Sequence, residues 1–435
     1  MRLIPRATQA SIGAAEHRTS RTSRAALASV GLLAAVTLVV SGCSSSSGSS
    51  ESKSLTLKVG TILPQTGSLS QLGPPEIVAV NLAERDINAA KAGIKVSVTQ
   101  KDSGDTSTDI ATQSVNALLA ENVGAIIGAA SSGVSLSVID KITQAAVVHF
   151  SPANTAPTFS TYKDNGFYFR NAPSDLLQGK VLAQKVLKDG HTKPAILFQN
   201  DDYGNGLNES LKSTFTQNGI TLVADQSFDP TASNFASEVS SVLAAKPDAV
   251  IVISYSQQFA PITQSLQTAG FNFANLYGTD GNYGTPGLPV DIAGAQFTNP
   301  GVQASKSFVT RLQKQTKRDS ASPLTVFSYA PESYDALVLI ALAALQGKAT
   351  DGTTIRDNLR SVSLGGTKCS TFAACAELIK SGENIDYEGL SGPITFDKAG
   401  DTAQAYISIY KYSSATDNSF ESSQFGDLRP KKSTK

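Results

Sequence analysis

The fold class is indicated most clearly by the segment Gly124-Ala125-Ile126-Ile127-Gly128-Ala129-Ala130-Ser131-Ser132. Residues 124–128 are predicted to form a buried strand, because strands of parallel sheets that are covered on both faces are apolar almost throughout. Val138, Ile139 and Ile142 then line one side of the helix that is predicted to follow. A buried strand followed by an amphipathic helix is the repeating unit of a parallel α/β sheet.

Similar units extend from this segment in both directions and make up a first set. On the N-terminal side, strands are predicted at residues 57–62 and 95–99, with helices at 76–90 and from Thr108 onward. On the C-terminal side a strand follows at residues 146–150. The chain could then cross to a second lobe after Arg170-Asn171-Ala172-Pro173.

A second set of units begins beyond that point. Strands are predicted at residues 195–198 and 249–253, and a helix carrying Leu207, Leu211 and Phe215 should end near Gly219, a natural C-terminal cap. Further elements are predicted as a helix at 261–269, an apolar helix at 334–345 and a strand at 403–412, with another crossover near Gly392-Pro393. The sequence therefore predicts two α/β domains.

Length and charge agree with a two-domain globular protein. The chain has 435 residues, which is more than one ordinary domain contains. Its 40% hydrophobic content is typical of a globular protein. Lys plus Arg and Asp plus Glu number 36 each, so no excess charge points to nucleic acid or to a generally acidic partner.

The N-terminal region is typical of an export signal. Several arginines precede an apolar run from Ala25 to Val40, which is shorter than the ~20 residues that a membrane-spanning helix needs. The run ends in Val40-Ser41-Gly42-Cys43, which resembles a bacterial lipobox and implies a signal peptide at residues 1–42 and lipidation of Cys43. The Ser-rich segment 43–54 would act as a flexible tether. The alternative is an uncleaved anchor with an incidental cysteine.

Two cysteines remain if Cys43 is acylated. Cys369 and Cys375 form an even pair in a protein that would face an oxidising exterior, so we expect a disulfide between them. Two free thiols are the alternative. A metal site is not expected, because no histidine lies nearby in the sequence.

Several short motifs occur in an order that resembles the branched-chain amino-acid type of periplasmic solute-binding protein, from Leu55 to about Tyr412. The motifs are Gly60-Thr61-Ile62-Leu63-Pro64-Gln65-Thr66-Gly67, Ala83 to Ala90, Gly128 to Ser132, Ser151 to Pro157, Asp202-Tyr203-Gly204, Lys246 to Val250, and Ser333 to Ala336. The resemblance implies a periplasmic-binding-protein type I fold, with two Rossmann-like lobes joined by three crossovers and a ligand in the cleft between them. The expected lobes are residues 55–171 with 300–391, and 172–299 with 392–414, followed by a polar tail at 415–435.

Candidate ligand-binding residues follow predicted strands, since ligands of open α/β sheets bind beyond the carboxyl ends of the strands. Ser131 and Ser132 begin a helix, where free N–H groups favour a ligand carboxylate, and Thr155 could add a hydroxyl donor. Asn154 is a further candidate. Ordinary helix capping is the alternative role of the two serines.

The second predicted lobe offers a carboxylate and two aromatic rings. Asp280 follows a short strand, and the resemblance implies an acid here that faces a ligand ammonium; a turn aspartate is the alternative. Tyr203 and Tyr255 end two buried strands and could cover the ligand, although Ser254 or Ser256 could take the place of Tyr255. Leu72 matches a position where relatives often have a large aromatic residue, so its part in the pocket stays open.

No feature of the sequence favours an enzyme. There is no G-x-S-x-G elbow, H-E-x-x-H motif or phosphate-binding loop, and His149 and His191 are better explained as structural residues. A secreted hydrolase is the least favoured alternative. No cofactor or metal is expected.

The combined expectation is a monomeric, lipid-anchored lipoprotein on the extracytoplasmic face of the cell membrane. It would capture an amino acid or a similar small polar ligand and deliver it to an ABC transporter permease, the partner that the resemblance implies. A sensor that presents the closed form to a membrane receptor is the alternative. Ligand identity stays open among amino acids, amides, urea and aromatic acids.

Overall fold

The computed structural model describes residues 54–429. The predicted signal peptide, Cys43 and nearly all of the Ser-rich tether lie outside the described residues. No helix within residues 54–429 is both long enough and apolar enough to cross a membrane.

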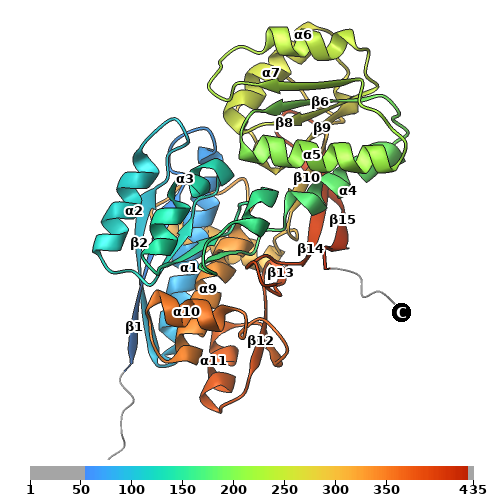
Figure 1. Cartoon of the computed structure of the whole chain (residues 1–435). Coiled ribbons are helices and arrows are strands. Elements are labelled where there is room, and N and C mark those ends of the chain that lie inside the picture. The colour runs from blue at the N-terminus through green and yellow to red at the C-terminus, as the bar shows by residue number, and fades with distance from the viewer. Residues whose placement is uncertain (1–53, 430–435) are drawn as a thin grey trace, which may run out of the picture. The chain divides into compact units, whose positions relative to one another are not determined.

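The first sheet contains five parallel strands in the order β2-β1-β3-β4-β5 (Figure 1). These strands are β1 Leu55–Leu63, β2 Ile94–Asp102, β3 Ala125–Gly128, β4 Val148–Ser151 and β5 Tyr168–Arg170. The order reverses between β1 and β3, so the loops that leave these two strands run to opposite sides. Ligands of doubly wound sheets bind at such a reversal.

Helices cover both faces of this sheet because successive strand residues point to opposite sides. Ile127 packs with α1 and α9 in one apolar cluster, whereas its neighbour Ile126 packs with α2 and α3 in another. The helices on this sheet are α1 Gly73–Ala90, α2 Ile110–Ala120, α3 Ser132–Gln144, α8 Lys306–Arg318, α9 Ala330–Gly347, α10 Gly352–Leu359 and α11 Phe372–Lys380. Three short strands lie beside them: β11 Thr367–Cys369, β12 Ile385–Gly389 and β13 Gly392–Pro393.

The second sheet has seven strands in the order β15-β14-β10-β9-β8-β6-β7. Its strands are β6 Pro194–Gln199, β7 Ala224–Phe228, β8 Ala249–Ile253, β9 Leu276–Gly278, β10 Gln296–Pro300, β14 Gln404–Tyr412 and β15 Asn418–Asp427. Helices α4 Asp175–Lys188 and α5 Asp202–Gln217 pack on one face, and α6 Ala236–Ala244 and α7 Ser256–Thr268 pack on the other. The order reverses between β6 and β8, which places the residues that follow these two strands at a second reversal point.

The chain passes between the two sheets three times. The passages lie between Arg170 and Asp175, between Pro300 and Lys306, and between Pro393 and Gln404. The predicted fold class, a periplasmic-binding-protein type I fold, is confirmed by these sheets and their connections. We infer that the first lobe contains the five-stranded sheet, that the second contains the seven-stranded sheet, and that the three passages separate them.

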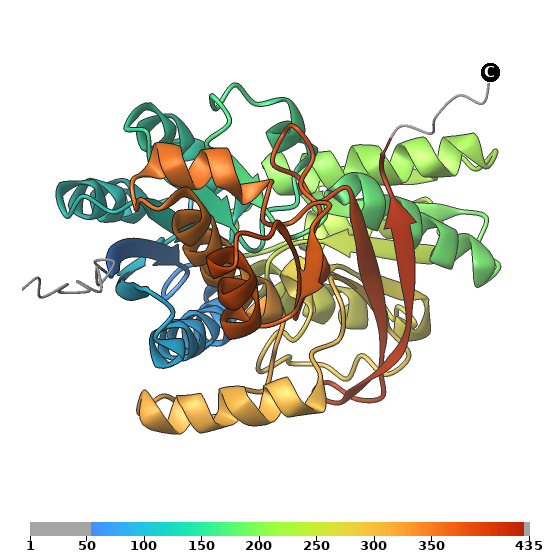
Figure 2. The ribbon, with the colours of Figure 1, turned by 90° about the horizontal axis from the view of Figure 1, so that it is seen from below.

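The expected polar tail at residues 415–435 is corrected by β15. This strand pairs antiparallel with β14 along its whole length and extends the second sheet (Figure 2). Ring contacts between Tyr406 and Phe425 and between Tyr410 and Phe420 add to the pairing. Most of β15 is exposed, so its residues lack the apolar pattern that would have indicated a strand in the sequence.

The predicted disulfide is present between Cys369 and Cys375. It joins β11 to α11 across a sequence separation of 6 residues. The bond therefore fixes a local turn, because a short closed loop restricts little of the unfolded chain.

His149 should make the protein less stable as the pH falls. Its ring is fully buried in β4, neither ring nitrogen has a hydrogen-bond partner within residues 54–429, and burial lowers its pKa to about 4. A histidine in the unfolded chain titrates near 6.5, so between these pH values the unfolded state binds the extra proton and gains stability. From pH 7 to pH 5 this should remove ~2 kcal/mol from the free energy of unfolding.

The variant His149→Phe isolates this effect. Urea unfolding at pH 7 and pH 5 should show a loss of stability that is ~2 kcal/mol smaller in the variant than in the wild type. Equal losses in both proteins would show that His149 does not account for the acid sensitivity.

Candidate functional site

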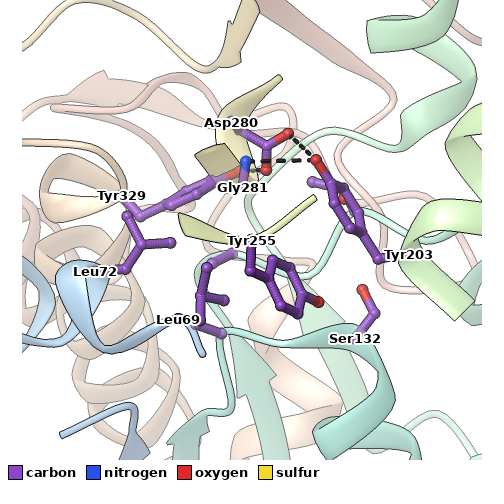
Figure 3. A pocket seen from close by; sticks show the side chains of 11 residues that line it. Leu69, Leu72, Ser132, Tyr203, Tyr255, Asp280, Gly281 and Tyr329 are labelled. Carbon is purple, nitrogen blue, oxygen red and sulfur yellow. Dashed lines mark hydrogen bonds between the residues drawn. The ribbon is translucent and has the colours of Figure 1, made fainter. Parts of the chain in front are cut away.

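A small chamber lies where the strand ends of the two sheets approach each other (Figure 3). Its lining residues are Leu69, Leu72, Ala130, Ser132, Ala153, Thr155, Tyr203, Tyr255, Asp280, Gly281 and Tyr329. Its volume of about 10 Å³ is enough for roughly one water molecule. A larger ligand can therefore enter only if the side chains or the lobes around the chamber move.

The first-lobe wall carries hydroxyl groups and a helix N-terminus. Ser132 is the first residue of α3, and the N–H groups of this first turn have no carbonyl partner within the helix. Thr155 follows β4 and is fixed through its carbonyl, which accepts a hydrogen bond from the Asp175 N–H at 2.8 Å. These groups offer donors and a positive helix end to an anion.

Two predicted residues of this wall, Ser131 and Asn154, do not line the chamber. Ser131 caps α3, where its Oγ accepts a hydrogen bond from the Val134 N–H, as the capping alternative expected. The Asn154 side chain donates to the carbonyls of Ala129 and Ala130 at 3.1 and 2.8 Å. Asn154 therefore holds the loop after β3, because its amide hydrogens are used within the fold.

The second-lobe wall is formed by two stacked tyrosines. Tyr203 in α5 and Tyr255, which precedes α7, have ring centroids 5.4 Å apart and an interplanar angle of 11°. The Tyr203 hydroxyl donates to Asp280 Oδ1 at 2.9 Å and lies 2.8 Å from Thr279 Oγ1. Tyr255, rather than Ser254 or Ser256, lines the chamber. Burial raises the pKa values of the Tyr203 and Tyr255 hydroxyls well above their usual range. Both hydroxyls therefore stay protonated and can donate hydrogen bonds.

Asp280 is held by three side chains and not by its own turn. Besides Tyr203 (Figure 3), the Gln178 amide donates to Oδ1 at 2.8 Å and the Tyr329 hydroxyl donates to Oδ2 at 2.6 Å. Burial raises the pKa of Asp280, and the three hydrogen bonds oppose that rise because they stabilise the ionised form. The geometry thus presents a carboxylate to the chamber in a water-poor setting.

A second buried acid, Asp175, was not identified from the sequence. It begins α4, is fully buried, and has no hydrogen-bond partner among the described residues for either carboxylate oxygen. Burial raises its pKa well above the usual range, and the charge of Asp280 raises it further. Ionisation is therefore less favourable for Asp175 than for Asp280, whose carboxylate accepts three hydrogen bonds.

Sequence reasoning also missed the apolar side of the chamber. Leu69, which precedes the short helix Ser70–Leu72, and Leu72 both line it, so the open question about Leu72 is answered by geometry. Tyr329 lines it from the residue before α9, in a backbone conformation with φ of 59°. A single residue in the left-handed backbone conformation belongs to no helix or strand pattern, so apolar periodicity could not predict its position in the chamber.

Several hydrogen bonds cross from one chamber wall to the other. Ser131 Oγ lies 3.2 Å from the Tyr255 hydroxyl, and the Gln71 side chain donates to the Gly281 carbonyl at 3.2 Å. Ser256 Oγ donates to Gln71 Oε1 at 2.7 Å. These bonds connect the two walls directly.

The chamber lacks the usual components of a metal or hydrolase site. Within residues 54–429, no group of three or more His, Cys, Asp or Glu side chains could hold a metal ion. Of the histidines within residues 54–429, neither His149 nor His191 lines the chamber beside Ser132 and Thr155. Its polar groups are hydroxyls and a helix N-terminus on one wall and the Asp280 carboxylate on the other.

Comparison with known proteins identifies relatives along almost the whole described chain. A family model described as periplasmic binding protein matches residues 56–417. A Brucella melitensis protein named Leu/Ile/Val-binding protein homolog 3 is 24% identical over 364 residues, which cover 82% of this chain and 91% of the relative. A Halobacterium salinarum protein named chemotactic signal transduction system substrate-binding protein BasB is 27% identical over 363 residues, which cover 80% and 85%.

Solved structures show the same fold. The crystal structure of a leucine-binding protein from Thermotoga maritima superimposes with a TM-score of 0.68 at 21% sequence identity. The match covers 84% of this chain and 98% of that protein.

Proposed function

Because this chain belongs to the periplasmic binding protein family, we propose that it is an extracytoplasmic protein that captures a small zwitterion, such as an amino acid, in the chamber between its lobes. The observation that carries this proposal is the separation of charge across the chamber. Ser132 and Thr155 offer donors on one wall, and Asp280 offers a carboxylate on the other.

A ligand carboxylate would bind at the first lobe. The hydroxyls of Ser132 and Thr155 and the first-turn N–H groups of α3 would replace the water that solvates it. Ser131 would contribute its main chain, because its hydroxyl is used for capping.

A ligand ammonium would bind to Asp280. A charge-assisted hydrogen bond contributes roughly 1.5 to 3 kcal/mol, which is enough to select a cationic group. The ring faces of Tyr203 and Tyr255 would cover the ligand as the lobes close. Binding can drive closure of the lobes only through contacts that the open form lacks. A ligand that is held first by the first lobe would gain such contacts from Asp280 and the two tyrosines of the second lobe.

We further propose that the protein is a monomeric lipoprotein, anchored through Cys43, that delivers its ligand to an ABC transporter permease. The relative named as a Leu/Ile/Val-binding protein supports an amino-acid ligand. The relative named for chemotactic signal transduction favours a second candidate, a sensor that presents the closed form to a receptor. A permease gene or a receptor gene beside this one would distinguish the two.

A thermal-shift panel tests the ligand class. A ligand at 100 times its dissociation constant adds ~2.7 kcal/mol to the free energy of unfolding, which raises the melting temperature by several degrees. We expect such a shift from one or more amino acids, and a much smaller shift from the matching carboxylic acid or the matching amine. If an amide, urea or an aromatic acid gave the only large shift, the zwitterion proposal would be wrong.

A further inference from the structure

A second and much larger cavity lies beside the chamber. This groove has a volume of about 1020 Å³, and Tyr329 lines both cavities. The second lobe contributes residues 283–287 and the β14–β15 hairpin to its walls, and the first lobe contributes α8 and residues 325–332. The second passage between the lobes forms the rest. The groove therefore spans both lobes.

Glu332 is a buried carboxyl on the wall of this groove. It lies in the first turn of α9, is 2% exposed, and forms no ion pair within residues 54–429. A Cβ atom at Gly301 would lie 2.2 Å from Glu332 Oε1. The glycine thus lets the carboxyl lie directly against the second passage between the lobes.

A second buried acid interacts electrostatically with Glu332. Glu76 in α1 is fully buried, and in the part of the chain that the structure describes neither of its carboxylate oxygens has a hydrogen-bond partner. Burial raises the pKa of Glu76 well above its usual range, and the charge of Glu332 raises it further. Two adjacent buried acids with no basic partner among the described residues are costly to ionise, and a bound cation would remove that cost.

Aromatic rings surround the opening above Glu332. The rings of Tyr283 and Tyr410 have centroids 4.7 Å apart, and Phe420, which is 38% exposed, lies 5.8 Å from Tyr410. Tyr410 and Phe420 line the same groove as Glu332, and burial raises the pKa of the Tyr410 hydroxyl to about 12. A carboxylate beside aromatic rings suits an ammonium group on an apolar stem. A metal ion is a poorer match, because the residues described offer no group of three ligands.

We propose that this groove is a second binding site, separate from the chamber, for a small organic cation of the alkylammonium class. The ammonium group pairs with Glu332, and the alkyl stem lies against Tyr410 and Phe420. Both lobes and the passage at Gly301 form the walls of this groove. A bound cation would therefore stabilise the relative position of the two lobes in which it makes the most contacts.

Calorimetric titration of the purified protein with n-hexylammonium tests this site, with 1-hexanol as the uncharged probe of similar shape. The wild type should bind hexylammonium at least 10-fold more tightly than hexanol. Glu332→Gln should weaken hexylammonium binding at least 10-fold, and Phe420→Ala, on an exposed ring, should weaken it several-fold. Asp280→Asn should change it less than two-fold, because the probe is not expected in the chamber.

The proposal would be overturned by the absence of heat from hexylammonium at millimolar concentrations, by equal affinity for hexanol, or by equal affinity in Glu332→Gln. A large loss in Asp280→Asn alone would also overturn it, by placing the probe in the chamber. If Glu332→Gln did not fold, the comparison of the two probes and the Phe420→Ala variant would still decide the question. None of these results bears on the zwitterion proposal, which the thermal-shift panel tests.

Discussion

Asp280→Asn is expected to weaken the binding of the best amino acid from the panel by about 100-fold, which corresponds to ~2.7 kcal/mol. The amide keeps the size of the side chain. Its single oxygen can still accept hydrogen bonds from the Tyr203 hydroxyl and the Gln178 amide, and its NH2 group then faces the Tyr329 hydroxyl, which can accept from it. It removes the negative charge, so a ligand ammonium would be buried without a counter-charge. Removing one partner of a buried charged pair costs about 2 to 5 kcal/mol.

Calorimetry with matched ligands gives this variant its control. A carboxylic acid that has the same side chain but no ammonium group should bind the wild type and Asp280→Asn with similar affinity, because the first-lobe wall is unchanged. If the amino acid bound the variant as tightly as the wild type, Asp280 would not be the ammonium partner.

The second large effect is expected at the buried ion pair of Arg170 and Asp401. Arg170 Nε donates to Asp401 Oδ1 at 2.6 Å, and Nη1 donates to the carbonyls of Asn154 and Ala156 at 3.3 and 2.8 Å. These carbonyls flank Thr155. Arg170 lies at the end of β5, next to the first passage between the lobes, and Asp401 lies in the third. The pair therefore connects two passages to the proposed carboxylate site.

Asp401→Asn should lower the free energy of unfolding by about 3 to 5 kcal/mol, because it leaves the Arg170 charge buried and unpaired. Urea unfolding at pH 7 measures the loss. The matched control is Asp427→Asn, which breaks the exposed pair with Arg429 and should leave the unfolding midpoint unchanged. A similar small effect at both positions would mean that Arg170 is stabilised by its backbone partners alone.

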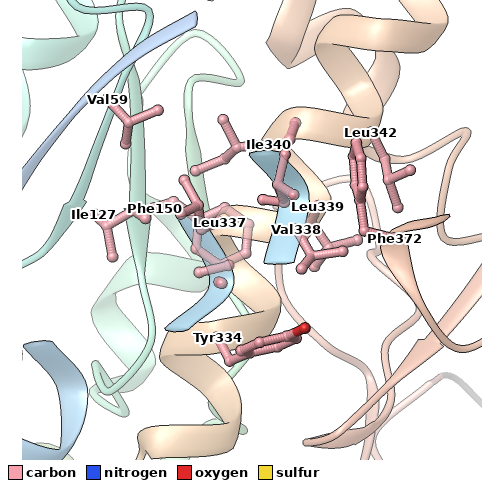
Figure 4. Close-up of a cluster of buried hydrophobic side chains, with 14 of the residues drawn as sticks. Val59, Ile127, Phe150, Tyr334, Leu337, Val338, Leu339, Ile340, Leu342 and Phe372 are labelled. Atoms are coloured by element: carbon pink, nitrogen blue, oxygen red, sulfur yellow. The ribbon is translucent and has the colours of Figure 1, made fainter. Parts of the chain in front are cut away.

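The main features of the fold could be predicted because they depend on apolar periodicity. Residues 334–345 predicted an apolar helix, and α9 extends over Ala330–Gly347 with almost every residue buried. Figure 4 shows why this helix is apolar all round: Leu337, Leu339 and Leu342 lie in a cluster that also contains residues of the first sheet and Phe372. The predicted family resemblance is likewise confirmed by the match over residues 56–417.

The limits of helices and of the chain end were less predictable. The predicted helix at residues 261–269 took Pro261 as its first residue, but α7 begins at Ser256 and contains the proline. Proline fits the start of a helix best, so its presence inside α7 misled the prediction. The strand β15 was missed for another reason: an exposed edge strand buries few side chains, and its pairing partner cannot be seen in the local sequence.

The sequence predicted those residues of the candidate site that directly follow buried strands. It did not predict the residues that only tertiary packing brings to the chamber. Ser132, Thr155, Tyr203, Tyr255 and Asp280 meet in one chamber because strand ends converge at the two reversal points. Tyr329 joins them through tertiary packing, and the burial of Asp175 can be recognised only in three dimensions. The predictions for Cys43 and the signal peptide concern residues that are not described.

The most direct test of the account is a crystal structure of the protein with the amino acid that gives the largest thermal shift. We predict that the ligand carboxylate lies within hydrogen-bond distance of Thr155 and the first turn of α3, and that its ammonium group lies within ~3 Å of an Asp280 oxygen. A ligand that is bound with the opposite polarity, or that makes no contact with Asp280, would contradict the account.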